Sequence, residues 1–498
     1  MILSEFSATI STMGVFFVMK RLKSYLIALG LIIIALLIIF LRQGVGFHIF
    51  GEYEKADQYT TGGGKISVPH WQGEPLEIVE ATWTDGGADD GFATAGNWAP
   101  VVVPDETAVV VLPSMAGETV SVSIPADRPT VIRGLQLGSG AGTVRFTANS
   151  PLIVKEKVEI PANATVALNC FDTPNVVSND VVIKSGGALT HDGLKKLNLV
   201  VTGNLTIEDG GAIDVNEKGY GPKDPVSYMP PSLFEPIDFG VQGDNTKYSG
   251  GVVKLEVTGT LTVNGSIDAC GTGGGGGGWS GGGGSIWLTV GTLAGSGRLR
   301  AHPCKNPNYP AADGDWCKPG GRIAVYQRVA TNWDAFSGTM NADGGKRNRA
   351  DGGESPAGTI YLETAADQPR CGEVIIRSDH TIYGETLLPL AGDGDIETKT
   401  VYTGVKLTVD GANLGITNSA WAASVPHTMN IRDIDVQTSR AKVNLHGATL
   451  KVSETTHRGG RDWEGWTKSD KPAAYAKHVV EDGGAILWPT PGLLLFVK

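Results

Sequence analysis

The chain of 498 residues contains 69 glycines, 7% aromatic residues and 19% charged residues, a composition that excludes a disordered polyelectrolyte. Its formal net charge is −11, and without residues 1–43 it is −14, because 37 basic and 51 acidic residues remain. Such an acidic body repels phosphate backbones, so we expect no nucleic acid partner.

Residues 1–43 are predicted to form a cytoplasmic tip and a signal-anchor transmembrane helix. Residues 24–41 are uncharged and almost entirely aliphatic, and they are long enough to cross the hydrocarbon core as a helix. Lys20, Arg21 and Lys23 precede this segment and should stay in the cytoplasm, which sends the body outward. We therefore expect a membrane-anchored protein with its body exported to the cell surface or periplasm. The alternative is a cleaved signal peptide and a secreted body.

The rest of the chain is predicted to consist of short strands. Residues 44–80 are polar, with little pattern, and are predicted to be a linker or stalk. From about residue 81, runs rich in Val, Ile and Thr alternate with Asn, Asp, Gly and Pro, which is typical of many short strands. Examples are Ala108–Leu112, Val120–Ile124, Thr143–Phe146, Val181–Ile183 and Leu199–Val201. Residues 81–170 should form an N-terminal β cap or the first coils of a solenoid.

An internal repeat favours a solenoid over a sandwich or barrel. The pattern T-G-x-L-T-[IV], followed by G-[AS]-I-D-[AV], begins at residue 202 and returns 56 residues later, at residue 258. Alternation along a strand predicts that Leu205, Ile207 and Ile213 point inward. Because one coil takes roughly 20–30 residues, we expect this repeat unit to span two or more coils.

A glycine tract at 271–284 lies between two predicted strands and is expected to form stacked turns. It is followed in order by the motifs GSIWL, GTLAGSG, GGRIAVY, FSGT and AGTIYL. With these motifs, residues 259–362 resemble the Gly-rich parallel β-helix modules of large bacterial cell-surface, adhesin-like proteins. The resemblance covers about a fifth of the chain, implies a right-handed parallel β-helix outside the cell, and transfers no catalytic residues. The chain departs from such modules by inserting PCKNPNYPAADGDWC where they usually have another glycine tract.

The expected fold is therefore all-β: a right-handed parallel β-helix, or β-solenoid, preceded by an N-terminal transmembrane helix. Residues 171–365 should form the Gly-rich β-helix. Residues 366–498 should form further coils and a C-terminal cap, with a polar insertion at 454–478.

One basic and aromatic stretch is the candidate contact for glycans or anions. Arg298, Arg300 and His302 alternate along the chain, so their side chains should face the same way on a strand. The planar guanidinium of arginine can donate two parallel hydrogen bonds to carboxylate or sulfate oxygens. Exposed aromatic rings can stack on sugar rings. The alternative is a solvated outer face with packed aromatic rings. The candidate residues are Arg298, Arg300, His302, Arg322, Trp287, Trp316 and Tyr326.

The sequence offers two further candidate sites. Cys304 and Cys317 flank the inserted loop and could form a disulfide in an oxidising compartment. Asp85, Asp89 and Asp90 could hold Ca²⁺ through oxygen ligands, although each carboxylate could instead serve its own turn. No other cofactor is expected.

The sequence favours a structural, adhesive or glycan-binding role, with a polysaccharide or cell-surface glycan as the partner. A polysaccharide lyase or glycoside hydrolase on the same scaffold is one alternative, because a fold does not set a function. A self-associating filament or stalk subunit is another, because uncapped solenoid ends can pair with each other. No catalytic residue is assigned.

Overall fold

The computed structural model describes residues 56–61, 64–69, 79–113, 119–138, 142–147, 150–221, 232–243, 247–272, 280–303, 318–345, 355–378, 384–390, 402–418, 428–438, 440–453, 479–480 and 482–487. The predicted membrane anchor at 24–41, the pair Cys304 and Cys317, and Trp316 lie outside these ranges. No helix within the described ranges is long and apolar enough to cross a membrane.

The chain divides into two compact units, Met1–Leu76 and Glu77–Lys498. In the first unit, β1 (Ala56–Thr61) and β2 (Gly64–Pro69) pair as an antiparallel hairpin. The described part of the second unit is built of strands, apart from one 3-10 turn, η1 (Ala95–Asn97), which confirms the prediction of an all-β chain.

Two sheets make up most of the second unit. The larger, of 14 strands, contains β7 (Thr130–Ile132), β10 (Leu152–Val154), β11 (Val158–Ile160), β13 (Asn175–Val177), β14 (Val181–Ile183), β16 (Leu197–Val201), β17 (Leu205–Ile207), β19 (Val252–Val263), β21 (Ser285–Ala294), β23 (Arg322–Gln327), β25 (Thr359–Glu363), β26 (Glu373–Arg377), β28 (Lys406–Asp410) and β31 (Asp433–Val436). The smaller, of 8 strands, contains β6 (Thr119–Ser123), β9 (Gly142–Thr147), β12 (Ala164–Leu168), β15 (Ala188–Thr190), β18 (Ala212–Asp214), β20 (Ser266–Asp268), β22 (Arg298–Arg300) and β24 (Thr339–Asn341).

Three short sheets complete this unit. One contains β3 (Val79–Trp83), β4 (Trp98–Ala99), β5 (Ala108–Leu112) and β8 (Gly134–Leu137). Another contains β27 (Glu385–Leu390), β29 (Asn413–Asn418), β32 (Lys442–Asn444) and β34 (Val479–Val480). The last contains β30 (Thr428–Ile431), β33 (Thr449–Val452) and β35 (Ala485–Leu487).

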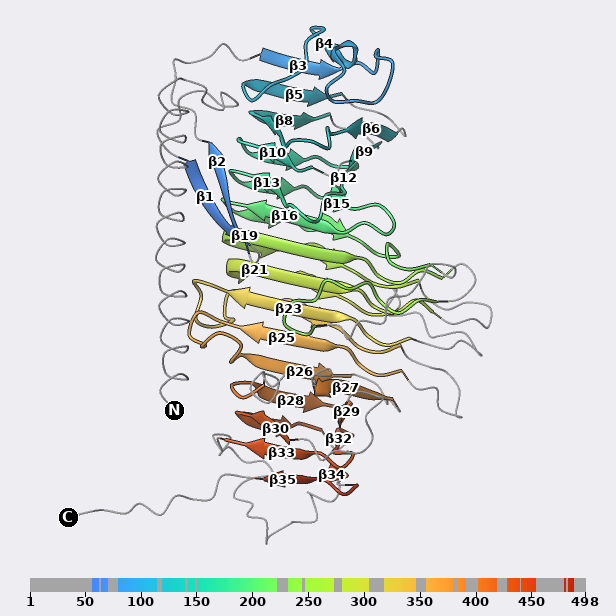
Figure 1. Ribbon diagram of the computed structural model, residues 1–498, viewed down its shortest axis with the longest axis vertical. Helices are drawn as coiled ribbons and strands as arrows, with labels where there is room; N and C mark the ends of the chain where they lie inside the picture. Colours follow the sequence, from blue (N-terminus) through green and yellow to red (C-terminus); the bar gives the residue numbers. More distant parts are fainter. Residues whose placement is uncertain are drawn as a thin grey trace, which may run out of the picture. The chain divides into compact units, whose positions relative to one another are not determined.

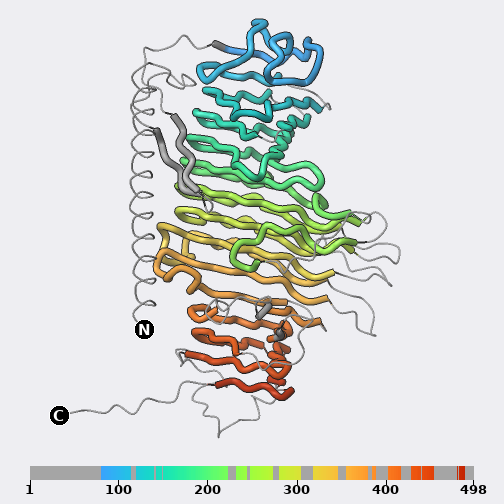
Figure 2. The backbone as a smooth tube through the Cα atoms, in the orientation of Figure 1, coloured from blue at the N-terminus to red at the C-terminus, as the bar shows by residue number. Residues whose placement is uncertain are grey.

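Successive turns of the chain lie one on another, and most strands pair in parallel with the strand of the next turn (Figure 1). β11 pairs with β14 and β14 with β17, and Val181 lies opposite Leu205, an offset of 24 residues. From β7 to β24, each turn contributes strands to both large sheets, as β13, β14 and β15 do before β16, β17 and β18. In Figure 2 the colours of the second unit follow the chain along this stack, so coils adjacent in sequence are adjacent in space.

The two copies of the internal repeat lie on two neighbouring coils, so one repeat unit spans a single coil. The prediction that it spans two or more coils is wrong. Leu205 on β17 lies directly opposite Leu261 on β19. The repeat spacing exceeds the usual offset because the chain makes a long excursion between β18 and β19. Leu205, Ile207 and Ile213 are completely buried, which confirms that they point inward.

Alternate residues of the strands build a continuous apolar core. Leu255, Leu288 and Val325 occupy equivalent positions on β19, β21 and β23, and each is almost completely buried. Full burial of such a side chain stabilises the fold by about 1.5–3 kcal/mol. Each coil therefore depends on its neighbours for its core.

Glycines at the starts of the strands allow neighbouring coils to approach backbone to backbone. A Cβ atom at Gly321 would lie 2.0 Å from the carbonyl oxygen of Gly284, and one at Gly358 would lie 1.8 Å from that of Gly321. The adjoining amide of Arg322 donates to the same Gly284 oxygen at 2.9 Å. The paired glycines thus remove side chains where the ladder between coils has no room for them.

We expect Gly321→Ala to lower the free energy of unfolding by about 2–3 kcal/mol, because the added methyl group overpacks a backbone contact. Urea unfolding measures this change. Gly193→Ala is the control, since no atom lies within 4 Å of a Cβ built there, and it should change stability by about 0.5 kcal/mol or less. Equal effects of the two substitutions would contradict the close-approach argument.

Strand direction reverses once along the large sheet, between β25 and β26. These strands are antiparallel, with Tyr361 opposite Val374. Ile360 belongs to the core of the coils before the reversal, whereas Tyr361 and Val374 belong to a second core formed with later strands. The sheet is continuous, but the first stack (β3–β25) and the second stack (β26–β35) enclose their cores on opposite faces of it.

Part of the excursion between β18 and β19, residues 232–243, lies against the outward face of the first stack. Phe234 is buried in the second core, and its carbonyl oxygen accepts a hydrogen bond from Tyr326 Oη at 2.6 Å. Further along, the carbonyl oxygen of Asp238 accepts a hydrogen bond from Ser285 Oγ at 2.6 Å. This segment therefore packs beside the outward side chains of β21 and β23.

Candidate functional site

The predicted contact residues fall on two different sheets. Arg298 and Arg300 lie on β22 of the eight-stranded sheet, and the residue between them is buried, so both face outward as predicted. Trp287, Arg322 and Tyr326 lie on β21 and β23 of the large sheet. The structure therefore does not bring the predicted residues into one neighbourhood.

On the eight-stranded sheet, Arg300 is already occupied by an acidic partner. Its Nε and Nη2 atoms donate to the two carboxylate oxygens of Asp268 at 2.7 and 2.9 Å, and the two side chains are only 12% and 5% exposed. Arg298 is 52% exposed, with its Nη2 atom 3.9 Å from the same carboxylate. His302 is buried. Of these three predicted residues, Arg298 alone is largely open to solvent.

On the large sheet, four adjacent strands of the first stack present their outward side chains in register. Lys254 lies opposite Trp287, and Glu256 lies opposite Thr289, which in turn lies opposite Tyr326. We call the outward side chains of this region the outer-face site. It comprises Lys254, Glu256, Trp287, Thr289, Arg322, Tyr326, Arg328, Thr359, Tyr361 and Glu363.

Two charged residues of the outer-face site, Lys254 and Glu256, are partly buried and form no ion pair with any residue that the structure describes. Burial lowers the pKa of Lys254, although Glu256 and Glu235 act in the opposite direction. Burial raises the pKa of Glu256, although Lys254 and Arg328 act in the opposite direction. The Lys254 ammonium lies 4.4 Å from the centroid of the Trp287 ring, a cation–π contact. Trp287 Nε1 is buried and has no hydrogen-bond partner. Charged groups desolvated in this way are concentrated at binding and catalytic sites.

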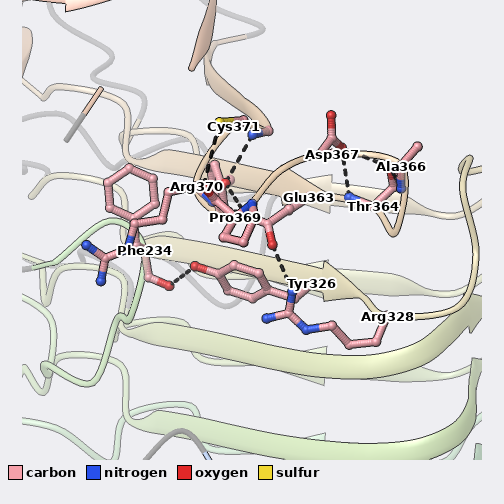
Figure 3. Close-up of polar contacts among 12 residues, drawn as sticks. Phe234, Tyr326, Arg328, Glu363, Thr364, Ala366, Asp367, Pro369, Arg370 and Cys371 are labelled. Carbon is pink, nitrogen blue, oxygen red and sulfur yellow. Dashed lines mark hydrogen bonds and ion pairs between the residues drawn. The ribbon is translucent and has the colours of Figure 1, made fainter. Parts of the chain in front are cut away.

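Glu363, on the last of the four strands of the site, fixes the positions of Arg328 and Tyr361 (Figure 3). Its carboxylate is only 3% exposed and accepts hydrogen bonds from Arg328 Nη1 at 2.8 Å, Tyr361 Oη at 2.7 Å and the Arg370 amide at 2.7 Å. The Arg328 guanidinium lies 4.8 Å from the centroid of the Tyr326 ring. Burial, with Glu363 adding to it, raises the pKa of both tyrosines, so their hydroxyls stay protonated near neutral pH.

The aspartates proposed as Ca²⁺ ligands lie in the N-terminal coils. Asp89 Oδ1 accepts hydrogen bonds from Thr94 Oγ1 at 2.5 Å and from the Gly91 amide at 2.9 Å. These bonds, that of Thr94 foremost, lower the pKa of Asp89. Across the described ranges, no three His, Cys, Asp or Glu side chains gather where they could hold a metal ion. The contacts of Asp89 are those of a turn-forming residue.

His191 is a buried histidine with both ring nitrogens in use. Nδ1 lies 2.7 Å from the carbonyl oxygen of Asp192, and Nε2 lies 3.2 Å from the amide nitrogen of Val252. The amide can only donate, so Nε2 accepts and Nδ1 carries the proton. Burial lowers the pKa of His191 to about 4, which keeps the ring neutral. The residue links two coils and has no free nitrogen for chemistry.

Lys254, Glu256, Arg328 and Glu363 were missed by the sequence analysis. A signal for two of them was present, since Lys254 and Glu256 alternate with apolar residues inside the strand sequence VVKLEV. Arg328 directly follows β23 and Glu363 is the last residue of β25. Charged residues at the ends of strands are common on any protein surface, so neither position was a signal in the sequence.

The geometry of the outer-face site is the basis for assigning a function. No protein-family model matches the chain, and no curated protein or solved structure shows significant similarity to it.

Proposed function

We propose that this protein is a right-handed parallel β-helix, tethered to a membrane through residues 24–41, that binds glycan chains at its outer-face site. The parallel pairing of successive coils supports the β-helix. The uncharged segment at 24–41 and its basic flank support an anchor with the body exported. The resemblance of residues 259–362 to cell-surface modules supports the same location.

The observation that carries the glycan proposal is the group formed by Lys254, Glu256 and Trp287. Among the described residues, neither charge has an ion pair and the indole nitrogen has no hydrogen-bond partner. A sugar hydroxyl both donates and accepts hydrogen bonds, so one sugar unit can satisfy a carboxylate, an ammonium and an indole N–H. Neighbouring strands lie about 4.8 Å apart, so the outward side chains of four strands can contact successive units of an extended chain.

A polysaccharide lyase is the second candidate, because Glu256 has a raised pKa and Arg328 stacks on Tyr326. Elimination from a uronate needs a base beside a cation that neutralises the sugar carboxylate. Tyr326 is a poor base, since its hydroxyl donates to Phe234 and burial raises its pKa. The remaining candidate bases in the described part of this site are Glu256 and Lys254, and no cation is paired with either to neutralise a sugar carboxylate, so we favour binding over cleavage.

The test is binding of the full chain, purified in a mild detergent, to an array of neutral, uronic and sulfated polysaccharides. We expect binding without shortened or unsaturated products. Trp287→Ala and Lys254→Met should each weaken binding about 10-fold or more, because each removes a central contact. Lys157→Met, at a 52% exposed lysine of an earlier coil, is the matched control and should bind normally.

Three results would decide against glycan binding as the sole function. The absence of binding across the array, or equal binding by Trp287→Ala, Lys254→Met and the control, rejects the proposed site. Products that disappear in Glu256→Gln would replace the binding proposal with the lyase.

A further inference from the structure

Arg322 is a partly buried cation without a partner. It opens β23, with Ser285 opposite on β21 and Thr359 opposite on β25. Among the described residues it makes neither a hydrogen bond nor an ion pair. Burial lowers its pKa to about 10, although Asp238 and Tyr402 act in the opposite direction, so the guanidinium stays charged at neutral pH. Removing a charge from water without pairing it is costly, which makes the position a candidate for a ligand.

Two buried donors next to Arg322 are also unpaired. Thr359 Oγ1, directly across from Arg322, has no hydrogen-bond partner, and neither has Trp287 Nε1 on the other neighbouring strand. Trp287 lies opposite Ala324, one outward position along the strand from Arg322. Buried polar atoms in folded proteins are nearly always hydrogen-bonded, so three unpaired donors on three adjacent strands point to a missing acceptor.

The other polar groups beside Arg322 do not supply that acceptor. Ser285 Oγ donates to the carbonyl oxygen of Asp238 at 2.6 Å, and the Asp238 carboxylate is not within ion-pair distance of Arg322. The Glu363 carboxylate has three donors of its own. A carboxylate or sulfate group has only acceptor atoms and matches the guanidinium fork, whereas a neutral hydroxyl accepts fewer hydrogen bonds.

We infer that Arg322 binds the acid group, carboxylate or sulfate, of an acidic glycan, with Thr359 Oγ1 and Trp287 Nε1 as further donors. This inference rests on the proposed glycan-binding function and gives it a ligand class. Uronate-bearing or sulfated polysaccharides bind, and chains without acid groups bind weakly. The cation used is Arg322, which lies on a different sheet from the more exposed Arg298.

The test compares matched oligosaccharides by titration calorimetry at constant ionic strength: an oligogalacturonate with its methyl ester, and a sulfated galactan with its desulfated form. We expect the wild type to bind each acidic form about 10- to 100-fold more tightly than its neutral partner. Arg322→Gln should remove that preference by lowering the affinity for each acidic form to about that for its neutral partner. Arg298→Gln is the matched control and should keep the preference.

A second measurement separates failure of this inference from failure of the proposed function. Sulfate and galacturonate alone are titrated into wild type and Arg322→Gln, and the melting temperature is followed. We expect a rise that depends on Arg322 and is reduced in Thr359→Val. If no glycan binds but this rise is present, the proposed function fails and the anion site stands.

Other outcomes overturn the inference. Equal affinity for acidic and neutral chains, or an acid preference that survives in Arg322→Gln, places the acid group elsewhere while leaving glycan binding intact. A melting temperature that responds to both anions equally in wild type and Arg322→Gln has the same meaning. Arg322→Lys guards against misfolding of the glutamine variant, because it keeps the charge, and it should retain an intermediate preference.

Discussion

Replacing Glu363 by leucine is expected to lower the free energy of unfolding by about 3–5 kcal/mol, because it removes a buried carboxylate and leaves three hydrogen-bond donors without their acceptor. The leucine side chain is one carbon shorter than that of glutamate and accepts no hydrogen bonds. Arg328 Nη1, Tyr361 Oη and the Arg370 amide would each lose their acceptor. Urea unfolding followed by circular dichroism measures the loss.

The matched control for Glu363→Leu is Glu235→Leu. Glu235 lies 3.5 Å from the Arg370 guanidinium, but both side chains are 55% exposed. Solvent screens such a pair, so its removal should cost about 1 kcal/mol or less. If Glu363→Leu is no more destabilised than Glu235→Leu, then Glu363 does not organise this region.

The position of Glu363 explains why the expected effect is large. It ends β25, at the start of the hairpin that reverses strand direction and moves the core to the other face of the sheet. In the same hairpin, Asp367 Oδ2 accepts hydrogen bonds from the Thr364 amide at 2.9 Å and from Thr364 Oγ1 at 2.8 Å (Figure 3). These contacts join the first stack to the second.

The second large effect is a loss of stability in acid caused by His191. Its pKa is about 4 in the folded protein and returns to its ordinary value of 6.5 on unfolding. Between these values the unfolded chain binds the additional proton, so stability rises with pH. The contribution is complete above pH 6.5 and is lost as the pH falls toward 4. A shift of this size corresponds to about 3 kcal/mol.

The measurement is the free energy of unfolding between pH 4 and pH 7 for wild type and His191→Gln. Glutamine can donate to the Asp192 carbonyl and accept from the Val252 amide, but it does not titrate. We expect the variant to have a shallower pH dependence, by about 3 kcal/mol across this range. Parallel pH profiles would show that His191 is not held neutral by the fold.

Local pattern alone determined the strands and the direction of their side chains. Ala108–Leu112 and Val181–Ile183 were predicted with the bounds that β5 and β14 have. Leu205 and Ile213 were correctly expected to point inward. These features are local, because β-propensity and the alternation of apolar and polar residues depend only on residues adjacent in the sequence.

Only the tertiary structure decided how the coils are joined and where the unpaired polar groups lie. The repeat spacing was misread because an excursion between β18 and β19 lengthens one coil without changing its strands. The reversal after Glu363 was invisible because the face that a strand buries depends on what packs against it. Lys254 and Thr359 became candidate ligand contacts for the same reason, whereas Arg322 was already a candidate from the sequence. Whether a polar group lacks a partner depends on segments distant in sequence, such as residues 232–243, that fold against it.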